Sequence, residues 1–184
     1  GEHGSVCTFG PLIHNPQEIA RLEERGIHQA SEVAEVGEGA IVLSAHGVDP
    51  EVESAAQECG LEVIDATCPF VKRAHGHILS LSKEGYAVVI LGDRGHREVE
   101  GLAARAGGQA EIVSSAEEVA RLPFHQRCGL VVQTTQRPEA LREVAGALAE
   151  RCPELRVFNT ICEATVRRQE SARELAEQVG TMVV

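Results

Sequence analysis

The 184-residue sequence has no tryptophan, one tyrosine and four phenylalanines, so aromatic residues make up only 3% of it. Aromatic side chains stack on single-stranded bases and form cages around quaternary ammonium ligands, and both kinds of site are therefore disfavoured. Basic residues are also few, because 17 of them face 28 acidic residues and the net charge is −11 at pH 7. A field of this sign repels nucleic acid and anionic membrane surfaces, so we expect neither as a partner.

A long apolar segment is missing as well. No run reaches the roughly 18 apolar residues that a membrane span needs. The start "GEHGSVCTFG" lacks the basic and apolar regions of a signal peptide. We therefore expect a cytoplasmic protein. The sequence begins with Gly and stops in "GTMVV", which predicts a strand without a partner, so we expect a piece of a longer protein.

The cysteines follow no familiar metal pattern, because they contain no C-x-x-C pair and none of the usual zinc spacings. Disulfides are not expected in a reducing cytoplasm. Two interpretations remain open. Either the thiols pack in the core, or cysteines that are distant in the sequence assemble a metal or cluster site. The six residues are Cys7, Cys59, Cys68, Cys128, Cys152 and Cys162.

Strand and helix patterns alternate along almost the whole sequence, which predicts an α/β fold of repeated units with mainly parallel sheets. With 43% apolar residues, the chain can form a substantial core. Apolar runs predict strands at 41–45, 61–66, 87–91, 110–113, 129–133, 155–158 and 181–184. Amphipathic patterns predict helices at 16–25, 50–59, 69–83, 97–106, 115–122, 137–151 and 163–179.

Two of the cysteines end similar segments. "VIDATC" (63–68) and "VFNTIC" (157–162) both contain two apolar residues, Asp or Asn, two further residues and Cys, and each precedes a predicted helix. A helix N-terminus favours the thiolate, which is the form that binds iron. Because equivalent points of repeated units can meet, we expect Cys68 and Cys162 to converge, and soft thiolates without zinc spacing suit an iron–sulfur cluster. Packing thiols remain the alternative.

Polar residues follow three predicted strands, in "AIVLSAHGVDPEVESAA", "AVVILGDRGHREVEGLAA" and "GLVVQTTQRPEALREVAG". In open α/β sheets, ligands bind outside the carboxyl ends of strands. These loops carry His46, His96 and Thr134, and His14 enters a turn in "LIHN". Neutral imidazoles donate hydrogen bonds without fixed charge, so the three histidines together suit a phosphorylated ligand. Each histidine taken alone is more often solvated or packed.

Glu98 lies two residues after His96, in the predicted first turn of a helix. A carboxylate at this position often only complements the helix dipole. In a dry pocket beside an anion, however, its pKa should rise and it could carry a proton to a substrate, with Glu100 as an alternative. The glycine-rich loops lack the phosphate-loop pattern with Lys before Ser or Thr, which disfavours ATP chemistry.

Six stretches together resemble the 4-hydroxy-3-methylbut-2-enyl diphosphate reductase family, the LytB family of isoprenoid biosynthesis. They occur in family order and at similar spacing over nearly the whole chain, as "GPLIHNPQ", "SAHGV", "DATCPFV", "GHREVEG", "VQTTQ" and "ICEATVRRQ". The resemblance implies an oxygen-sensitive iron–sulfur enzyme with reduced ferredoxin or flavodoxin as electron donor. It also implies removal of the allylic hydroxyl as water, which gives isopentenyl and dimethylallyl diphosphate.

The resemblance further implies an architecture and a set of site residues. In the family, three α/β units surround a central [4Fe–4S] cluster held by three cysteines, and the iron without a protein ligand receives the substrate hydroxyl. Cys68 and Cys162 match the second and third cysteines, and Glu98 matches the acid of the proton relay. The positions that match contacts to the diphosphate or the hydroxyl are His14, His46, His96 and Thr134.

The chain also departs from the family pattern. The first cluster cysteine is expected upstream of Gly1, and a Ser and Asn motif of the diphosphate site is expected after Val184, so we expect this piece alone to be inactive. Arg97 replaces the usual proline, which alters a helix start without removing Glu98. We expect an incomplete first unit at 1–67, a second unit at 68–161 and the truncated start of a third at 162–184.

Two other functions remain open at this point. The chain could be a non-redox α/β module that binds a phosphorylated metabolite through His14, His46 and His96, with thiols that only pack. It could also be an inactive, truncated homologue.

Overall fold

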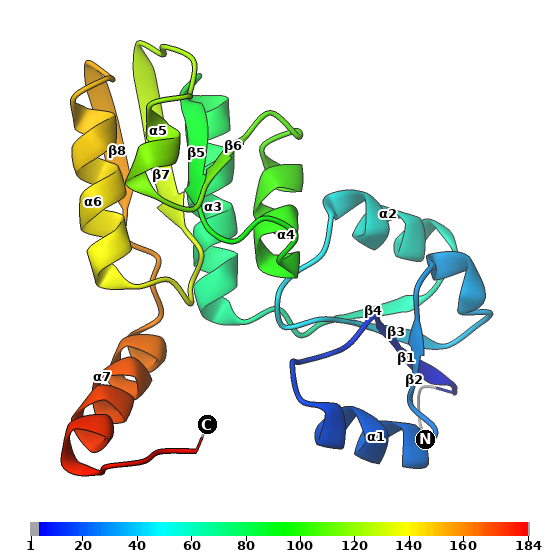
Figure 1. Ribbon diagram of the computed structural model, residues 1–184. Coiled ribbons are helices and arrows are strands. Elements are labelled where there is room, and N and C mark those ends of the chain that lie inside the picture. Colours follow the sequence, from blue (N-terminus) through cyan, green and yellow to red (C-terminus); the bar gives the residue numbers. More distant parts are fainter. Residues whose placement is uncertain (1–3, 184) are drawn as a thin grey trace.

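The first part of the chain builds a four-stranded parallel sheet. The computed structural model describes residues 4–183, and Figure 1 shows the path of the chain. The strands of this sheet lie in the order β2-β1-β3-β4, with every neighbouring pair parallel. Its elements are β1 (Val6–Phe9), α1 (Pro16–Glu24), β2 (His28–Ala30), the 3₁₀ helix η1 (Val33–Glu35), β3 (Ala40–Leu43), α2 (Pro50–Glu58) and β4 (Glu62–Asp65).

A second four-stranded sheet repeats this topology in the order β6-β5-β7-β8, again with parallel neighbours. In both sheets the strand that comes second in the chain lies at one edge and the fourth lies at the other. The predicted α/β fold with repeated parallel sheets is therefore confirmed. The elements are α3 (Pro69–Lys83), β5 (Ala87–Leu91), α4 (Arg97–Arg105), β6 (Glu111–Val113), α5 (Ala116–Val119), β7 (Arg127–Val132), α6 (Pro138–Ala149), β8 (Glu154–Phe158) and α7 (Glu163–Gln178).

Helix starts follow the local sequence closely. Asn15 and Asp49 accept hydrogen bonds from the first turns of α1 and α2, at 3.1 and 2.9 Å, and a proline follows each of them. Proline is favoured at the first helical position because its φ angle is already helical and its missing N–H needs no partner there. Since each helix follows directly after a strand, these starts bring helix N-termini to the carboxyl ends of the sheets.

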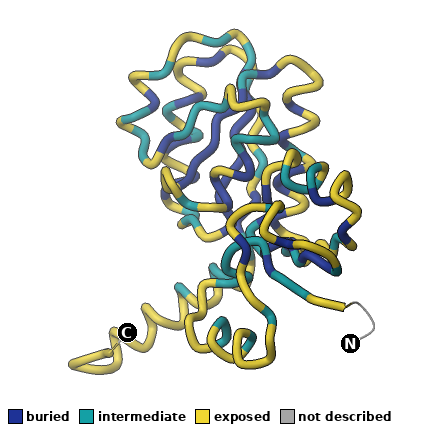
Figure 2. The backbone as a smooth tube through the Cα atoms, turned by 90° about the vertical axis from the view of Figure 1, so that its right-hand side faces the viewer, coloured by how far each residue is buried: buried dark blue, intermediate teal, exposed yellow. Residues whose placement is uncertain are grey.

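The second sheet carries the larger apolar core. Figure 2 shows its buried strands inside the unit, with exposed residues on the outer surface. One side of this sheet packs on α5 and α6, and the other side packs on α3 and α4. The core of the first sheet is smaller and is formed by Ala30, Val36, Ile41, Ala56 and Leu61. Burial of apolar side chains thus anchors the second sheet more firmly than the first.

Three strands differ from the prediction. The strand predicted at 181–184 is wrong over 181–183, which form no ladder, and Val184 lies outside the described residues. Strand β1 was not among the predicted strands. The short edge strand β2 was also missed, because its sequence HQA has none of the usual apolar pattern. The other predicted strands and helices agree with the structure to within a few residues.

The last helix, α7, projects away from the second sheet (Figure 1). It has 16 residues, and none of them is buried within the described part of the chain. Among residues 4–183, no helix is both long enough and apolar enough to cross a membrane.

Gly129 in the central strand β7 tests how tightly α3 packs on the second sheet. A methyl group added there would lie 2.3 Å from both Cδ atoms of Leu81, which is fully buried in α3. We expect Gly129→Ala to lower the free energy of unfolding by about 1–3 kcal/mol through overpacking. Gly146→Ala on the open face of α6 should instead raise it by about 0.5–1 kcal/mol. Urea unfolding measures both, and equal effects would contradict this packing.

Candidate active site

The carboxyl ends of six strands meet around one cavity of about 200 Å³. The side chains expected to form the site come from the loops after β1, β3, β4, β5 and β7 and from the segment after β8. All seven line this cavity, namely His14, His46, Cys68, His96, Glu98, Thr134 and Cys162. The loops after the edge strands β2 and β6 contribute none of its lining residues. The geometry therefore unites residues from both sheets.

The two cysteines occupy equivalent positions, each as the residue before the first turn of a helix. Cys68 precedes α3 and Cys162 precedes α7, and both are half-buried with free thiols. Within the described chain, neither side chain makes a hydrogen bond that caps its helix. Both thiols thus remain available as ligands at helix N-termini, which favour anionic sulfur.

The backbone of each cysteine is tied to a loop that carries another site residue. The N–H of Cys68 donates to the carbonyl of Ala45 at 2.9 Å, next to His46. The N–H of Cys162 donates to the carbonyl of Thr134 at 2.8 Å. These bonds join the chain two to four residues beyond the last paired residues of β3–β4 and β7–β8, so each cysteine has a fixed place beside the neighbouring loop.

The shared Asp or Asn of the two segments explains why their sequences are similar. Oδ1 of Asp65 accepts from the N–H of Thr67 at 2.9 Å, and Oδ1 of Asn159 accepts from the N–H of Ile161 at 3.2 Å. Each side chain thus closes the same local turn, which Asp and Asn both favour. Lys72 forms an ion pair with Asp65 at 2.5 Å. The turn leads the chain from the last strand of each sheet to its cysteine.

The three histidines form a compact group. The ring centroid of His14 lies 4.3 Å from that of His46 and 5.4 Å from that of His96, and His46 and His96 are 5.9 Å apart. Burial lowers the pKa of His46 to about 4, and the neighbouring charges of His14, His96 and Arg97 act in the same direction. His46 is therefore neutral at neutral pH. Its buried Nδ1 has no hydrogen-bond partner among residues 4–183.

His96 also caps α4, and this bond defines its tautomer. The backbone N–H of Glu98 donates to Nδ1 of His96 at 3.1 Å, so Nδ1 is the unprotonated nitrogen. In the neutral ring the proton is then on Nε2. His96 can offer this N–H to a ligand while its other nitrogen stabilises the helix start.

Glu98 and Thr134 form the most buried polar contact of the cavity. Glu98 is 2% exposed, and its two carboxylate oxygens accept from the N–H and the hydroxyl of Thr134, at 2.7 and 2.8 Å. Burial raises the pKa of Glu98, whereas the hydrogen bonds from Thr134 and the charge of His96 act to lower it. A dry carboxyl group with a raised pKa can hold and release a proton next to a hydroxyl group.

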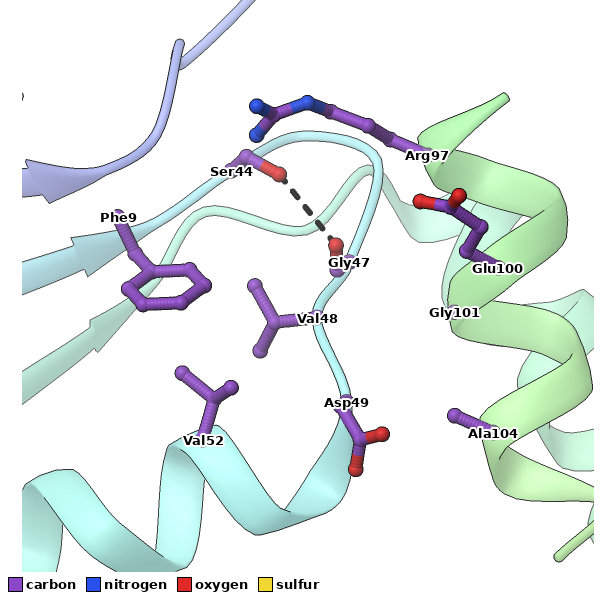
Figure 3. Close-up of a pocket in the computed structure, with 10 residues that line it drawn as sticks. All are labelled: Phe9, Ser44, Gly47, Val48, Asp49, Val52, Arg97, Glu100, Gly101 and Ala104. Atoms are coloured by element: carbon purple, nitrogen blue, oxygen red, sulfur yellow. Dashed lines mark hydrogen bonds between the residues drawn. The ribbon is translucent and has the colours of Figure 1, made fainter. Parts of the chain in front are cut away.

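Arg97 faces away from this cavity. Figure 3 shows its side chain extending over the loop at Ser44, where it lines a second cavity of about 330 Å³. The loop between β3 and α2 and the start of α4 form the wall between the two cavities, with Glu100 and Gly101 on the Arg97 side. α4 still begins at residue 97 and keeps Glu98 in its first turn.

Several supporting residues escaped the sequence prediction. Gln133 is buried, and its side chain accepts from the N–H of Asp93 and donates to the hydroxyl of Thr135, both at 2.8 Å. It thereby joins the loop before α4 to the loop that carries Thr134. The hydroxyl of Thr160 bonds to both backbone groups of Val132. The cavity is completed by Ala45, Phe70, Val71, Thr135 and Thr165. The only sequence signal for these supporting residues is their position near Cys68, Cys162 and Thr134.

No group of three or more His, Cys, Asp or Glu residues in the described part of the chain has the arrangement of a metal site. Cys7 cannot complete one with Cys68 and Cys162, because it lies within β1 and packs against the core of the first sheet. Cys68 and Cys162 are therefore the two cysteines of the described chain that line the cavity.

The comparisons with known proteins agree on one family. The family described as "LytB protein" matches residues 1–184. 4-Hydroxy-3-methylbut-2-enyl diphosphate reductase of Citrifermentans bemidjiense is 50% identical over 178 residues, which are 96% of this chain and 63% of the relative. The same enzyme of Pelobacter propionicus is 46% identical over the whole chain and 66% of its own length. The chain thus spans slightly less than two thirds of these curated relatives.

Two solved structures are similar over almost the whole chain. One is a structure of (E)-4-hydroxy-3-methyl-but-2-enyl diphosphate reductase, described as the terminal enzyme of the non-mevalonate pathway, with a TM-score of 0.80 and 43% identity. The similarity extends over 96% of this chain and 64% of the chain in that structure. The other is the reductase from Plasmodium falciparum, with a TM-score of 0.88 and 27% identity over 95% of this chain and 56% of that one.

Thr134→Val tests the contact with Glu98, because valine keeps the shape but removes the hydroxyl donor. The loss leaves a buried carboxylate oxygen unpaired and raises the pKa of Glu98 further. When the pKa of a carboxyl group is higher in the folded than in the unfolded protein, the free energy of unfolding falls as the pH rises through both values. Unfolding in urea should therefore show a loss of about 1–3 kcal/mol at pH 8 and a smaller loss at pH 5. A loss independent of pH would show that Glu98 is not involved.

Proposed function

The chain belongs to the LytB protein family, and from this membership we propose that the protein is a 4-hydroxy-3-methylbut-2-enyl diphosphate reductase. The proposed reaction removes the allylic hydroxyl as water and gives isopentenyl and dimethylallyl diphosphate. Replacing a C–O bond by a C–H bond in this way consumes electrons and protons. The single observation that carries the proposal is that two thiols, three imidazoles, a hydroxyl and a buried acid line one cavity.

We assign Cys68 and Cys162 as two of the ligands of a [4Fe–4S] cluster. This assignment is supported by their thiols, which stand at helix N-termini and face the cavity. When bound, the cluster supplies electrons and a Lewis-acidic iron for the substrate hydroxyl. A third cysteine is expected from the part of the family pattern upstream of Gly1. The electron donor in this proposal is a reduced ferredoxin or flavodoxin, and the location is the cytoplasm.

We assign the three histidines to the diphosphate group. A neutral imidazole donates one hydrogen bond, and Nε2–H of His96 is available because Nδ1 already accepts from the backbone. An anion beside His46 would favour its imidazolium form, which opposes the effect of burial on its pKa. Binding of the diphosphate should therefore be accompanied by proton uptake. Such donors adapt their charge to the ligand, which fixed cations cannot do.

We assign Glu98 as the group that delivers a proton to the leaving hydroxyl. The assignment is supported by its burial and by its raised pKa. Thr134 orients the carboxyl group through both oxygens, and its own hydroxyl lies at the cavity wall, where it can contact the substrate hydroxyl. Exclusion of water from this corner keeps the proton on the path between Glu98 and the substrate.

The cysteine assignment predicts a loss of cluster on substitution. Full-length protein purified without oxygen should be brown, and Cys68→Ser or Cys162→Ser should each remove most of the visible absorbance, iron and sulfide. Cys59→Ser is the matched control, because Cys59 is exposed at the end of α2 and should leave all three unchanged. Iron and sulfide analysis also separates the reductase from a non-redox module, which would contain neither. Unchanged absorbance in the Cys68 and Cys162 variants would refute the assignment.

The role of Glu98 predicts a separation of binding from turnover. Glu98→Gln keeps the shape of the side chain but removes the transferable proton, so turnover should fall by about 100-fold or more while the KM changes little. Glu100→Gln is the matched control, because Glu100 lies in the same first turn but lines the other cavity. Steady-state kinetics without oxygen measure both variants. Nearly normal turnover of Glu98→Gln would assign the proton to another group.

A further inference from the structure

The loop that carries His46 belongs to the first sheet but is held by helices of the second. It connects β3 to α2 and turns at Gly47, whose N–H donates to the carbonyl of Ser44 at 3.1 Å. The hydroxyl of Ser44 in turn donates to the carbonyl of Gly47 at 3.4 Å, which is the bond drawn in Figure 3. The positive φ angle of Gly47, +79°, favours glycine at this point. The loop passes between α3 and α4, so its position depends on contacts between the two units.

From α3, the ring of His75 closes one side of the loop. A methyl group added at Gly47 would lie 2.5 Å from Cε1 and 3.0 Å from Nε2 of His75, which leaves no space between ring and backbone. His75 is 5% exposed, and its Nε2 has no hydrogen-bond partner in the part of the chain that the structure describes. A buried nitrogen without a hydrogen-bond partner lowers stability, so polar contacts of Nε2 do not account for the burial of His75. The space that the ring fills beside Gly47 does.

From α4, Gly101 and Arg105 close the other side. A methyl group on Gly101 would lie 3.8 Å from the carbonyl oxygen of His46, so the helix backbone passes directly along the loop. Nη1 of Arg105 donates to the carbonyl of Val48 and also contacts the carbonyl of Gly101 at 3.4 Å. One guanidinium group thus joins the end of the loop to α4, the helix that His96 caps.

We propose that His75 and Arg105 are positioning residues that hold the loop at 46–48 against α4 and thereby keep His46 at its place beside His96. Neither residue lines the cavity of the candidate site. They contact the loop from outside this cavity, where they line a separate cavity of about 240 Å³. We call the contacts of His75 and Arg105 with the loop the clamp. Its effect on diphosphate binding rests on the proposed function, whereas the contacts themselves do not.

Arg105→Gln in the full-length protein tests the clamp, with two separate measurements. Hydrogen–deuterium exchange of peptides that contain residues 44–48 should become faster, because the carbonyl of Val48 loses its charged donor. The KM of the diphosphate substrate and the Kd of inorganic pyrophosphate should rise about tenfold, as expected for loss of one charge-assisted hydrogen bond, with kcat changed less than twofold. Arg105→Lys should recover part of the affinity.

Matched variants distinguish positioning from a general loss of stability. Arg142→Gln removes an exposed arginine from α6 and should change neither the exchange nor the KM. His75→Ala provides a second route, since removal of the ring should also speed exchange at 44–48 and raise the KM. A lower Tm without a change in exchange or KM in these variants would assign a purely structural role and overturn the proposal.

The outcomes also separate this inference from the proposed function. Unchanged exchange at 44–48 in Arg105→Gln and His75→Ala overturns the clamp, even if the wild type binds pyrophosphate. A second outcome is that exchange at 44–48 is faster in the variants, but the wild type neither binds pyrophosphate nor turns over substrate. This outcome supports the clamp and overturns the diphosphate site.

Discussion

The candidate site depends on one repeated interaction, the hydrogen bond from a cysteine N–H to the carbonyl of the neighbouring loop. Cys68 makes it to Ala45 and Cys162 makes it to Thr134. Because parallel strands end at the same edge of a sheet, this bond extends the pairing into the loops and fixes the distance between thiol and polar residues. The sheets act as supports, and the seven candidate residues lie within the two to seven residues that follow the strand ends.

Much of this arrangement can be read from the sequence, because local rules dominate at these points. The Asp or Asn in "VIDATC" and "VFNTIC" closes a turn within three residues, and prolines mark the first positions of several helices. Alternating apolar strands and amphipathic helices give the parallel sheets directly. The seven residues predicted for the site line one cavity, because each lies beyond the carboxyl end of a strand and these ends face the same region.

The remaining features arise from contacts between segments that are distant in the chain, which no local pattern records. His75 and Gly47 lie in different units, and so do Arg105 and Val48, yet each pair is in contact. Burial decides the ionisation of His46 and Glu98, and burial is a property of the assembled fold. The strand expected at 181–184 failed over 181–183 for the same reason, since an apolar segment becomes a strand only when a neighbour pairs with it.

The two sheets repeat one backbone plan, but the repetition does not extend to charge. The turn before Cys68 uses a carboxylate that is balanced by Lys72, whereas the turn before Cys162 uses the neutral amide of Asn159. The ion pair near Cys68 thus lies in the turn before it, whereas the ion pair near Cys162 lies after it, between Glu163 and Arg167 of α7. A ligand held by both thiols would therefore meet a different arrangement of charge at each sulfur.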